Sequence, residues 1–435
     1  MPRRTTRAHC SRVQDANEPL ELVVERLTYG GDGLAHHDGQ VVFVPYVAPG
    51  DRVRARIVER RPGFARAELC DVVGEGHART APRCPLFGRC GGCQWQHLAT
   101  PAQRAAKTAI VAEQLARLGG LRDVDVRPAR SGDDAWGYRA RITLLVEGRR
   151  LGFRRARSHA LVEIDDCAIA DPALVAHLGI AREWVARLRA APNRLTLARA
   201  ADGVVLVADT RRSPGPTDVE ATEDLLARHA SVRGAVLSGT GARIVVGDPH
   251  VPVPLEPDLQ LEVPADAFTQ VNPSANLLLV ATVLELAGGV AGWRVLDLYC
   301  GAGNFTVPLA RRGADVLGIE RSEPAVAAGR ANAARLGIPA ARFLRGAAAP
   351  ELARLPAEAL DLVVLDPPRA GAADVVPLLV ARRPRRVVYV SCDPATLARD
   401  AGVLVAGGYR PGRVQPIDLF PHTYHIETVA EFVLK

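Results

Sequence analysis

VVYVSCDP, residues 387–394, is the stretch that decides the fold of the last third of this 435-residue chain. Its apolar run, Val387 to Val390, is typical of a buried strand. Pro394 stops that strand, because proline has no backbone N–H to donate to a sheet. The stretch therefore places one thiol, that of Cys392, at the exposed end of a strand.

Two further predicted strands end in polar residues. The run Val295–Tyr299 is followed by the turn Cys300–Asn304, and the run Leu362–Asp366 is followed by Pro367-Pro368-Arg369. From about Leu261 onward, strand and helix patterns alternate, which indicates a doubly wound α/β sheet. Ligands bind at the carboxyl ends of the strands in such sheets. We therefore expect one site that holds a thiol, a glycine loop and an acid.

The glycine loop indicates the class of cofactor. Gly301-x-Gly303 follows a predicted strand, and Glu320 ends the next strand at the spacing expected of an acid that binds a ribose diol. NAD remains an alternative, although the three-glycine fingerprint is incomplete. The sequence Asp-Pro-Pro at 366–368 favours S-adenosylmethionine.

Charge and composition suggest a polyanionic partner. The net charge is +7 and the isoelectric point is about 9.2, which fits nucleic acid, although an arginine-rich proteome would give the same balance. No long apolar run predicts a membrane span. Residues 1–18 carry Arg3, Arg4, Arg7 and Arg12 without an apolar core, so we expect a disordered basic arm rather than a secretory signal, and a cytoplasmic location.

Residues 19–75 are predicted to form a small β domain. In the run Arg52–Val58, apolar and arginine positions alternate, so that Arg52, Arg54 and Arg56 share one face. An arginine-studded face suits RNA phosphates, and a solvated strand face is the alternative. The turn Gly30-Gly31-Asp32-Gly33 and the later Val-Phe-Val-Pro and Pro-Gly-Asp segments resemble the TRAM domain, an OB-like RNA-binding module.

Three cysteines lie close together in the sequence Cys84-x5-Cys90-Gly-Gly-Cys93. Thiolates select zinc or an iron–sulfur cluster, and both remain open from the spacing alone. A fourth ligand is needed; Cys167 is the best candidate and His97 the nearest rival. A helix is expected at residues 102–118, followed by a mostly β middle segment that carries Cys167.

Together these motifs resemble the uracil-5 RNA methyltransferase family over residues 20–435. The matching segments also include Phe268-Thr269-Gln270-Val271-Asn272 and Phe420-Pro421-His422-Thr423-x-His425-x-Glu427. The resemblance implies an α/β chain: a Rossmann-like class I methyltransferase domain (261–435), an N-terminal OB-like TRAM barrel (19–75) and a central α+β domain (76–260). It also implies a monomer that methylates C5 of a uridine with S-adenosylmethionine.

The resemblance also assigns roles to residues. It implies Cys392 as the nucleophile that adds to C6 of uracil, Glu427 as the general base and a [4Fe–4S] cluster in the central domain. The methyl donor would contact Gln270, Tyr299, Asn304, Glu320 and Asp366, and the cluster would be bound by Cys84, Cys90, Cys93 and Cys167. Cys300 is a rival nucleophile, but we expect it to pack in the tight turn of the donor loop.

The sequence departs from the family pattern at one position, and the RNA substrate and the class of protein each have alternatives. The family usually has an Asp or Asn after the fourth strand, whereas residues 343–347 here are Phe-Leu-Arg-Gly-Ala, so the adenine contact is open. Family members that combine a TRAM domain with a cluster act on 23S rRNA, which we favour over tRNA. A non-catalytic RNA-binding protein and an iron–sulfur redox protein are the rival classes.

Overall fold

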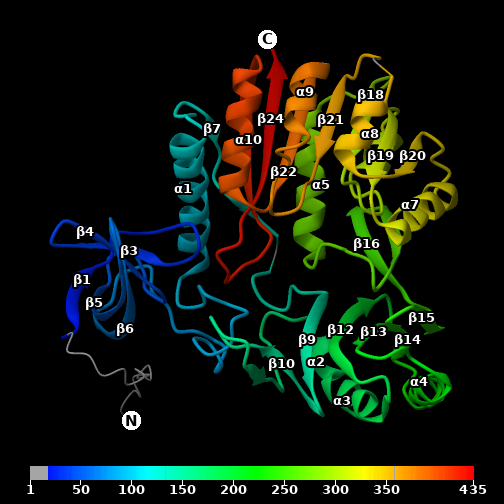
Figure 1. Cartoon of the computed structure of the whole chain (residues 1–435), viewed down its shortest axis with the longest axis horizontal. Coiled ribbons are helices and arrows are strands. Elements are labelled where there is room, and N and C mark those ends of the chain that lie inside the picture. Colours follow the sequence, from blue (N-terminus) through cyan, green and yellow to red (C-terminus); the bar gives the residue numbers. More distant parts are fainter. Residues whose placement is uncertain (1–17, 133, 357) are drawn as a thin grey trace.

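The computed structural model describes residues 18–132, 134–356 and 358–435, so the predicted basic arm lies outside the described residues apart from Glu18. Figure 1 shows an N-terminal β unit on one side of the molecule, a central unit below and a large α/β unit above. No helix among the described residues has the length and apolar character needed to cross a membrane.

The N-terminal unit is a six-stranded sheet in the order β1-β5-β6-β4-β3-β2. Alternation along β5 buries Val53 and Ala55 and exposes Arg52 and Arg54, as the sequence predicts. The strands are β1 (Leu20–Val23), β2 (Arg26–Leu27), β3 (Gly33–His37), β4 (Gln40–Val44), β5 (Arg52–Arg61) and β6 (Phe64–Gly74).

The central unit is built on a seven-stranded sheet in the order β11-β10-β9-β12-β13-β14-β15. Helices α2 (Pro172–Ala176), α3 (Leu178–Arg187) and α4 (Pro216–Arg228) accompany it, and a hairpin of β16 (His250–Glu256) and β17 (Leu259–Pro264) follows. The sheet strands are β9 (Arg141–Glu147), β10 (Arg150–Arg154), β11 (Leu161–Glu163), β12 (Pro192–Ala200), β13 (Gly203–Thr210), β14 (Val232–Gly239) and β15 (Ala242–Gly247).

The C-terminal unit is the predicted doubly wound sheet. Its order is β20-β19-β18-β21-β22-β24-β23-β7, and β8 also pairs with β23. The first five strands are parallel, and β24 enters antiparallel between β22 and β23. The strands are β18 (Arg294–Leu298), β19 (Asp315–Glu320), β20 (Ala341–Arg345), β21 (Leu362–Leu365), β22 (Arg386–Ser391), β23 (Tyr409–Asp418) and β24 (Glu427–Leu434).

Helices cover both faces of this sheet, because successive strand residues alternate between two hydrophobic cores. Val388 and Val390 face the core that includes α5, whereas Val387 and Tyr389 face the core that includes α10. The helices are α5 (Pro273–Ala287), α6 (Thr306–Arg311), α7 (Glu323–Arg335), α8 (Ala348–Arg354), α9 (Val376–Arg382) and α10 (Pro394–Ala406).

A segment from before the central sheet joins the C-terminal unit. Helix α1 (Thr100–Leu118) packs beside α10, with Ile110 and Leu115 in the same core as Leu397 (Figure 1). Two short strands, β7 (Asp125–Val126) and β8 (Arg130–Ser131), then pair with β23 along its outer edge. The predicted domain boundaries stay a prediction, but residues 100–131 are bound to the C-terminal sheet.

Candidate active site

The predicted nucleophile and base lie opposite each other at the carboxyl end of β22. Ser391 of β22 pairs with Thr428 of β24 in antiparallel register. Extending that register by one residue sets Cys392 opposite Glu427, and residues directly opposite have Cβ atoms about 4.5–5.5 Å apart. The sheet itself therefore brings together two residues that are 35 positions apart.

The turn after Cys392 is fixed by a helix cap. The Asp393 carboxylate accepts hydrogen bonds from the backbone N–H groups of Ala395 and Thr396, both at 3.0 Å, and Pro394 occupies the first turn of α10. A cap of this kind satisfies amide groups that the helix leaves unpaired. Cys392 is held, half-buried, between a strand end and a helix start.

Several carboxyl groups gather near Cys392. Burial raises the pKa of Asp366 to about 7, and it raises the pKa of Glu427 well above its usual range, with the Asp366 charge adding to the effect. Burial also raises the pKa of Asp297 to about 7, to which the neighbouring Asp366 and Glu320 contribute. Clustered acids favour a cationic ligand, and the methyl donor carries a positive sulfonium.

The same surroundings act on the thiol. Burial first, then the charges of Glu427 and Asp366, raise the pKa of Cys392 to about 11, while Arg369 opposes the shift. The thiolate is the nucleophilic form. A cation bound among the acids would lower this pKa.

The predicted ribose-binding acid reaches the glycine loop. One carboxylate oxygen of Glu320 accepts a hydrogen bond from the Gly301 N–H at 3.2 Å, and the other accepts from the Ser322 N–H at 2.7 Å. Tyr299 has a left-handed backbone with φ of 63°, which turns the chain sharply out of β18. Tyr299, Gly301 and Glu320 are thus assembled at adjacent strand ends.

Asn304 and Gln270, the other predicted donor contacts, lie on either side of Asn276. The Asn304 and Asn276 side-chain amides exchange two hydrogen bonds, both at 3.0 Å. Gln270 and Asn276 line the same small cavity. Gln270 and Asn304 stay predicted contacts of the methyl donor.

The rival nucleophile Cys300 is buried in the donor loop. A Cβ atom added at Gly318 would lie 2.7 Å from its Sγ atom. Burial raises the pKa of Cys300 well above its usual range. This packing is the one expected from the tight turn, and it separates Cys300 from the strand end that carries Cys392.

The four predicted cluster cysteines line one cavity of about 440 Å³. Cys167 comes from the loop after β11, and Cys84, Cys90 and Cys93 come from the segment between β6 and α1. The rival ligand His97 instead has its Nε2 atom 3.0 Å from the Val47 carbonyl oxygen. Among the described residues, no three His, Cys, Asp or Glu side chains converge as closely as a single metal ion requires.

The hydrogen-bond donors and the buried cation around this cavity suit anionic sulfur. The sulfur of Cys90 accepts a hydrogen bond from the Gly92 N–H at 3.4 Å, and backbone N–H groups of Ile169 and Ala170 bond to Cys167. Arg139 is a buried cation beside these thiols, and its Nε has no hydrogen-bond partner among the described residues. Burial raises the pKa of Cys93 to about 12, and it also raises the pKa of Cys90 and Cys167.

Sequence reasoning missed several residues at the candidate site. Asp297 lies in the predicted strand Val295–Tyr299 and has no predicted role, although its Oδ2 atom accepts a hydrogen bond from the Thr306 hydroxyl at 2.6 Å. Arg369 follows Pro367-Pro368 in the sequence and has no predicted role in the site, yet its charge acts on Cys392. Tyr29, from the N-terminal unit, donates a hydrogen bond to Asp393. The strand-end position of Asp297 was a usable signal, whereas the approach of Tyr29 is purely tertiary.

The arginine face of β5 is partly neutralised. Arg54 forms an ion pair with Asp71 of β6 at 2.9 Å, and both side chains are exposed. Arg52 is exposed and Arg56 is half-buried. The face remains basic, but one of its three charges is already partnered.

Comparison with known proteins gives matches over the whole chain. Residues 255–433 match the family described as tRNA (Uracil-5-)-methyltransferase, and residues 17–70 match the TRAM domain. The 23S rRNA (uracil(1939)-C(5))-methyltransferase RlmD of Alkalilimnicola ehrlichii is 39% identical, covering 95% of this chain and 96% of the relative. The protein of the same name from Thiobacillus denitrificans is also 39% identical, covering 93% of this chain and 98% of the relative.

A solved structure is similar over the same extent. The Pyrococcus abyssi tRNA (uracil-54, C5)-methyltransferase, in complex with S-adenosyl-L-homocysteine, superposes with a TM-score of 0.74 at 25% identity. The match covers 95% of this chain and all of that one. The two chains therefore share their overall fold.

Proposed function

This chain belongs to the uracil-5 RNA methyltransferase family, and from that premise we propose that it methylates C5 of one uridine in 23S ribosomal RNA. It is an RNA methyltransferase that uses S-adenosylmethionine. The choice of 23S rRNA rests on relatives of that name at 35–39% identity along nearly the whole chain. An RNA substrate would place the reaction in the cytoplasm.

One observation supports the proposed mechanism: Ser391 of β22 pairs with Thr428 of β24, and the same register continued by one residue sets Cys392 opposite Glu427. C5 of uracil is a weak nucleophile, so a thiolate must first add to C6. Cys392 supplies that thiolate; the new C6–S bond displaces the ring electrons onto the O4 enolate, which makes C5 nucleophilic.

The methyl donor, when bound, supplies an electrophilic methyl group whose transfer to C5 leaves a neutral thioether. Asp366 and the acids around it suit the cationic sulfonium and the ribose, and Gln270, Tyr299, Asn304 and Glu320 complete the proposed contacts. Asn304 is held for that role by Asn276.

Glu427 completes the reaction. After methyl transfer, its carboxylate accepts the C5 proton; the C–H electrons form the C5=C6 double bond, and the C6–S bond breaks to release the Cys392 thiolate. The Oε1 atom of Glu427 is buried and has no hydrogen-bond partner among the described residues, so it is available to accept a proton.

We further propose that Cys84, Cys90, Cys93 and Cys167 bind a [4Fe–4S] cluster. The support is that all four line one cavity with N–H donors to sulfur and a buried arginine beside them. A cluster accepts thiols that are too far apart for one ion. It supplies a long-range link between chain segments, and no step of methyl transfer uses it. We expect the protein to act as a monomer.

The substrate is tested by nucleoside mass spectrometry of separated ribosomal and transfer RNA from cells with and without the gene. Loss of 5-methyluridine from 23S rRNA alone is the expected result. Loss from tRNA alone would instead favour the activity named for the Pyrococcus relative, whose fold is similar along the chain.

A further inference from the structure

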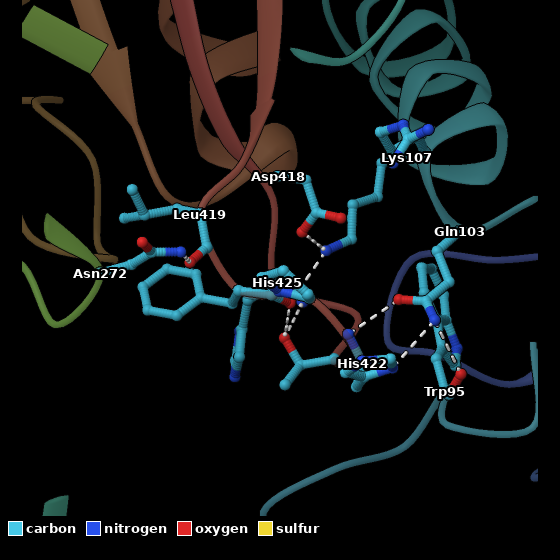
Figure 2. Close-up of polar contacts among 12 residues, drawn as sticks. Trp95, Gln103, Lys107, Asn272, Asp418, Leu419, His422 and His425 are labelled. Carbon is cyan, nitrogen blue, oxygen red and sulfur yellow. Dashed lines mark hydrogen bonds and ion pairs between the residues drawn. The ribbon is translucent and has the colours of Figure 1, made fainter. Parts of the chain in front are cut away.

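The connection between β23 and β24, residues 419–426, leads directly into Glu427. Glu427 is the first residue of β24, and it also pairs with Ile417 near the end of β23. The direction of its carboxylate therefore depends on how this connection is held. Figure 2 shows that Gln103 and Lys107 of α1 reach this connection from outside it.

Lys107 of α1 holds the start of the connection. Its side chain is completely buried, and its Nζ atom lies 2.6 Å from the Asp418 carboxylate. The same ammonium group donates a hydrogen bond to the Phe420 carbonyl oxygen at 3.1 Å (Figure 2). One cation thus fixes both the last residue of β23 and the backbone two residues later.

Gln103, one helical turn before Lys107, holds the middle of the connection. Its Oε1 atom accepts a hydrogen bond from the His422 backbone N–H at 2.8 Å. Its Nε2 atom lies 3.1 Å from Nδ1 of the same histidine and donates to the carbonyl oxygens of Trp95 and Leu98 (Figure 2). Residues four apart share one helix face, so α1 presents both side chains together.

His422 needs this support because its backbone is unusual. Its φ of 66° lies in the left-handed region, which is uncommon for residues other than glycine. Such a conformation persists where the surroundings fix it. Besides Gln103, the N–H groups of Gln94 and Trp95 donate to the His422 carbonyl oxygen at 3.0 and 2.9 Å, and its ring stacks on Trp136 at 3.8 Å.

We propose that Gln103 and Lys107 are positioning residues for Glu427. They fix the β23–β24 connection so that the Glu427 carboxylate faces C5 of the uracil that is bonded to Cys392. The inference rests on the proposed role of Glu427 as the base. It predicts a defect in one step: proton removal and thiolate release slow, while addition of Cys392 and methyl transfer continue.

The specificity of this defect follows from what each group contacts. Cys392 is fixed by β22 and by the α10 cap, and neither Gln103 nor Lys107 contacts it among the described residues. Glu427 has a carboxylate oxygen without a partner, so its position is set by its backbone. A displacement of about 1 Å can cost about 10²-fold in a catalysed step.

Two substitutions test the inference in the full-length protein. Gln103→Met keeps the side-chain length and removes the bonds to His422. Lys107→Met is paired with Asp418→Leu, because Lys107→Met alone leaves a buried carboxylate without its cation, whereas an apolar pair is often tolerated. Glu113→Gln is the matched control, since it removes an α1 ion pair, with Arg26, far from the connection.

The assay follows a single turnover with a methyl-labelled donor and a 23S rRNA fragment. Denaturing gels separate methylated RNA bound to protein from methylated RNA released. Glu427→Gln provides the reference, in which the methylated adduct accumulates. We expect both test variants to form the adduct within about twofold of the wild-type rate and to release it about 10- to 100-fold more slowly. Glu113→Gln should behave as wild type.

The outcomes distinguish the positioning role of Gln103 and Lys107 from the role of Glu427 as the base. If Glu427→Gln accumulates adduct but both test variants release RNA at the wild-type rate, Gln103 and Lys107 do not position the base. Equal slowing of formation and release would mean a general structural role, which also overturns the inference. If Glu427→Gln itself releases RNA normally, the assignment of the base fails, independently of α1.

Discussion

The strand-end site and the cysteine site are assembled in different ways. Cys392 directly follows β22 and Glu427 begins the neighbouring β24, so the register that pairs Ser391 with Thr428 brings the two together. Cys84 and Cys167 lie on loops from distant parts of the chain and share only the lining of a cavity. The first site is brought together by paired strands, whereas the second is gathered by loops whose backbone N–H groups bond to Cys90 and Cys167.

The two sites also differ in charge. The strand-end site gathers Asp297, Asp366 and Glu427, and the effect of burial and mutual repulsion is to raise the pKa of these acids. The cysteine site has a buried cation, Arg139, beside Cys90, Cys93 and Cys167, and burial raises the pKa of these three thiols. The first site is suited to a cationic ligand and the second to an anionic one.

The largest effect should come from Cys392→Ala. We expect methylation to fall by about 10⁴-fold or more, because covalent activation of the base is lost. Binding of S-adenosylmethionine, measured by calorimetry, should persist. RNA that carries 5-fluorouridine should trap a covalent adduct with the wild type, since fluorine at C5 cannot leave as a proton.

Cys300→Ala is the matched control for this prediction. It should still form the trapped adduct, because Cys300 packs against Gly318 in the donor loop. An adduct that forms on Cys392→Ala but not on Cys300→Ala would exchange the two assignments.

The second effect concerns the cysteine site. Anaerobically purified protein should contain about four iron and four sulfide per chain, and Cys167→Ser should lose them. Because metal binding stabilises the fold that gathers its ligands, Tm should fall by several degrees. Methyl transfer in a single turnover should change much less than Tm.

Cys70→Ser, on β6 of the N-terminal unit, is the control thiol and should retain the cluster. Stoichiometric zinc in place of iron would reject the cluster, and full retention of iron in Cys167→Ser would require another fourth ligand, with His97 the first to test.

The third effect is a dependence of stability on pH. The folded protein holds a proton on Asp297 with a pKa of about 7, whereas an unfolded Asp has a pKa of about 3.9. The folded state therefore binds more protons in this window, and the stability present below the unfolded pKa is lost as pH rises through the folded pKa. Tm without donor should fall from about pH 4 to pH 7.

Asp297→Asn should flatten this slope, whereas Glu220→Gln, on the exposed face of α4, should leave it unchanged. Adding S-adenosylmethionine should raise Tm more at pH 8 than at pH 5, because its cation offsets the ionised acids. An equal gain at both values would mean that the acids do not sense the donor charge.

The smallest effect should come from the arginine face of β5. Replacing Arg52, Arg54 and Arg56 with Ala should reduce the salt dependence of RNA binding by about two units of log–log slope, at just under one unit per phosphate contact. The loss is smaller than three contacts would give because Arg54 already pairs with Asp71. Both sites should keep their activity and iron content. An unchanged slope would identify a solvated face.

Much of the fold could be read from local pattern. The apolar run before Cys392, the alternation at Arg52–Val58 and the glycine loop each predict an element that the structure contains. Glu320 could be found because a ribose-binding acid has a characteristic spacing from the loop. These signals are local. The strand order of an α/β fold then brings the predicted strand ends to one edge of the sheet.

Other features depend on contacts that no local pattern encodes. Nothing in the run that contains Lys107 predicts a buried ammonium group beside Asp418, 311 positions later. The approach of Tyr29 to Asp393 likewise requires the N-terminal unit to dock on the α/β unit. Residues 343–347 lack the Asp or Asn that the family usually has after β20, and no local pattern predicts which residue replaces it.

The pairing of β7 and β8 with β23 has a practical consequence for fragments of this protein. An α/β unit cut at residue 261 would lack both short strands and α1, and the outer edge of β23 would have open backbone donors and acceptors. Exposed edges of this kind recruit other strands, so such a fragment should aggregate. A fragment that keeps α1, β7 and β8 on this edge therefore begins before Thr100, well upstream of the glycine loop.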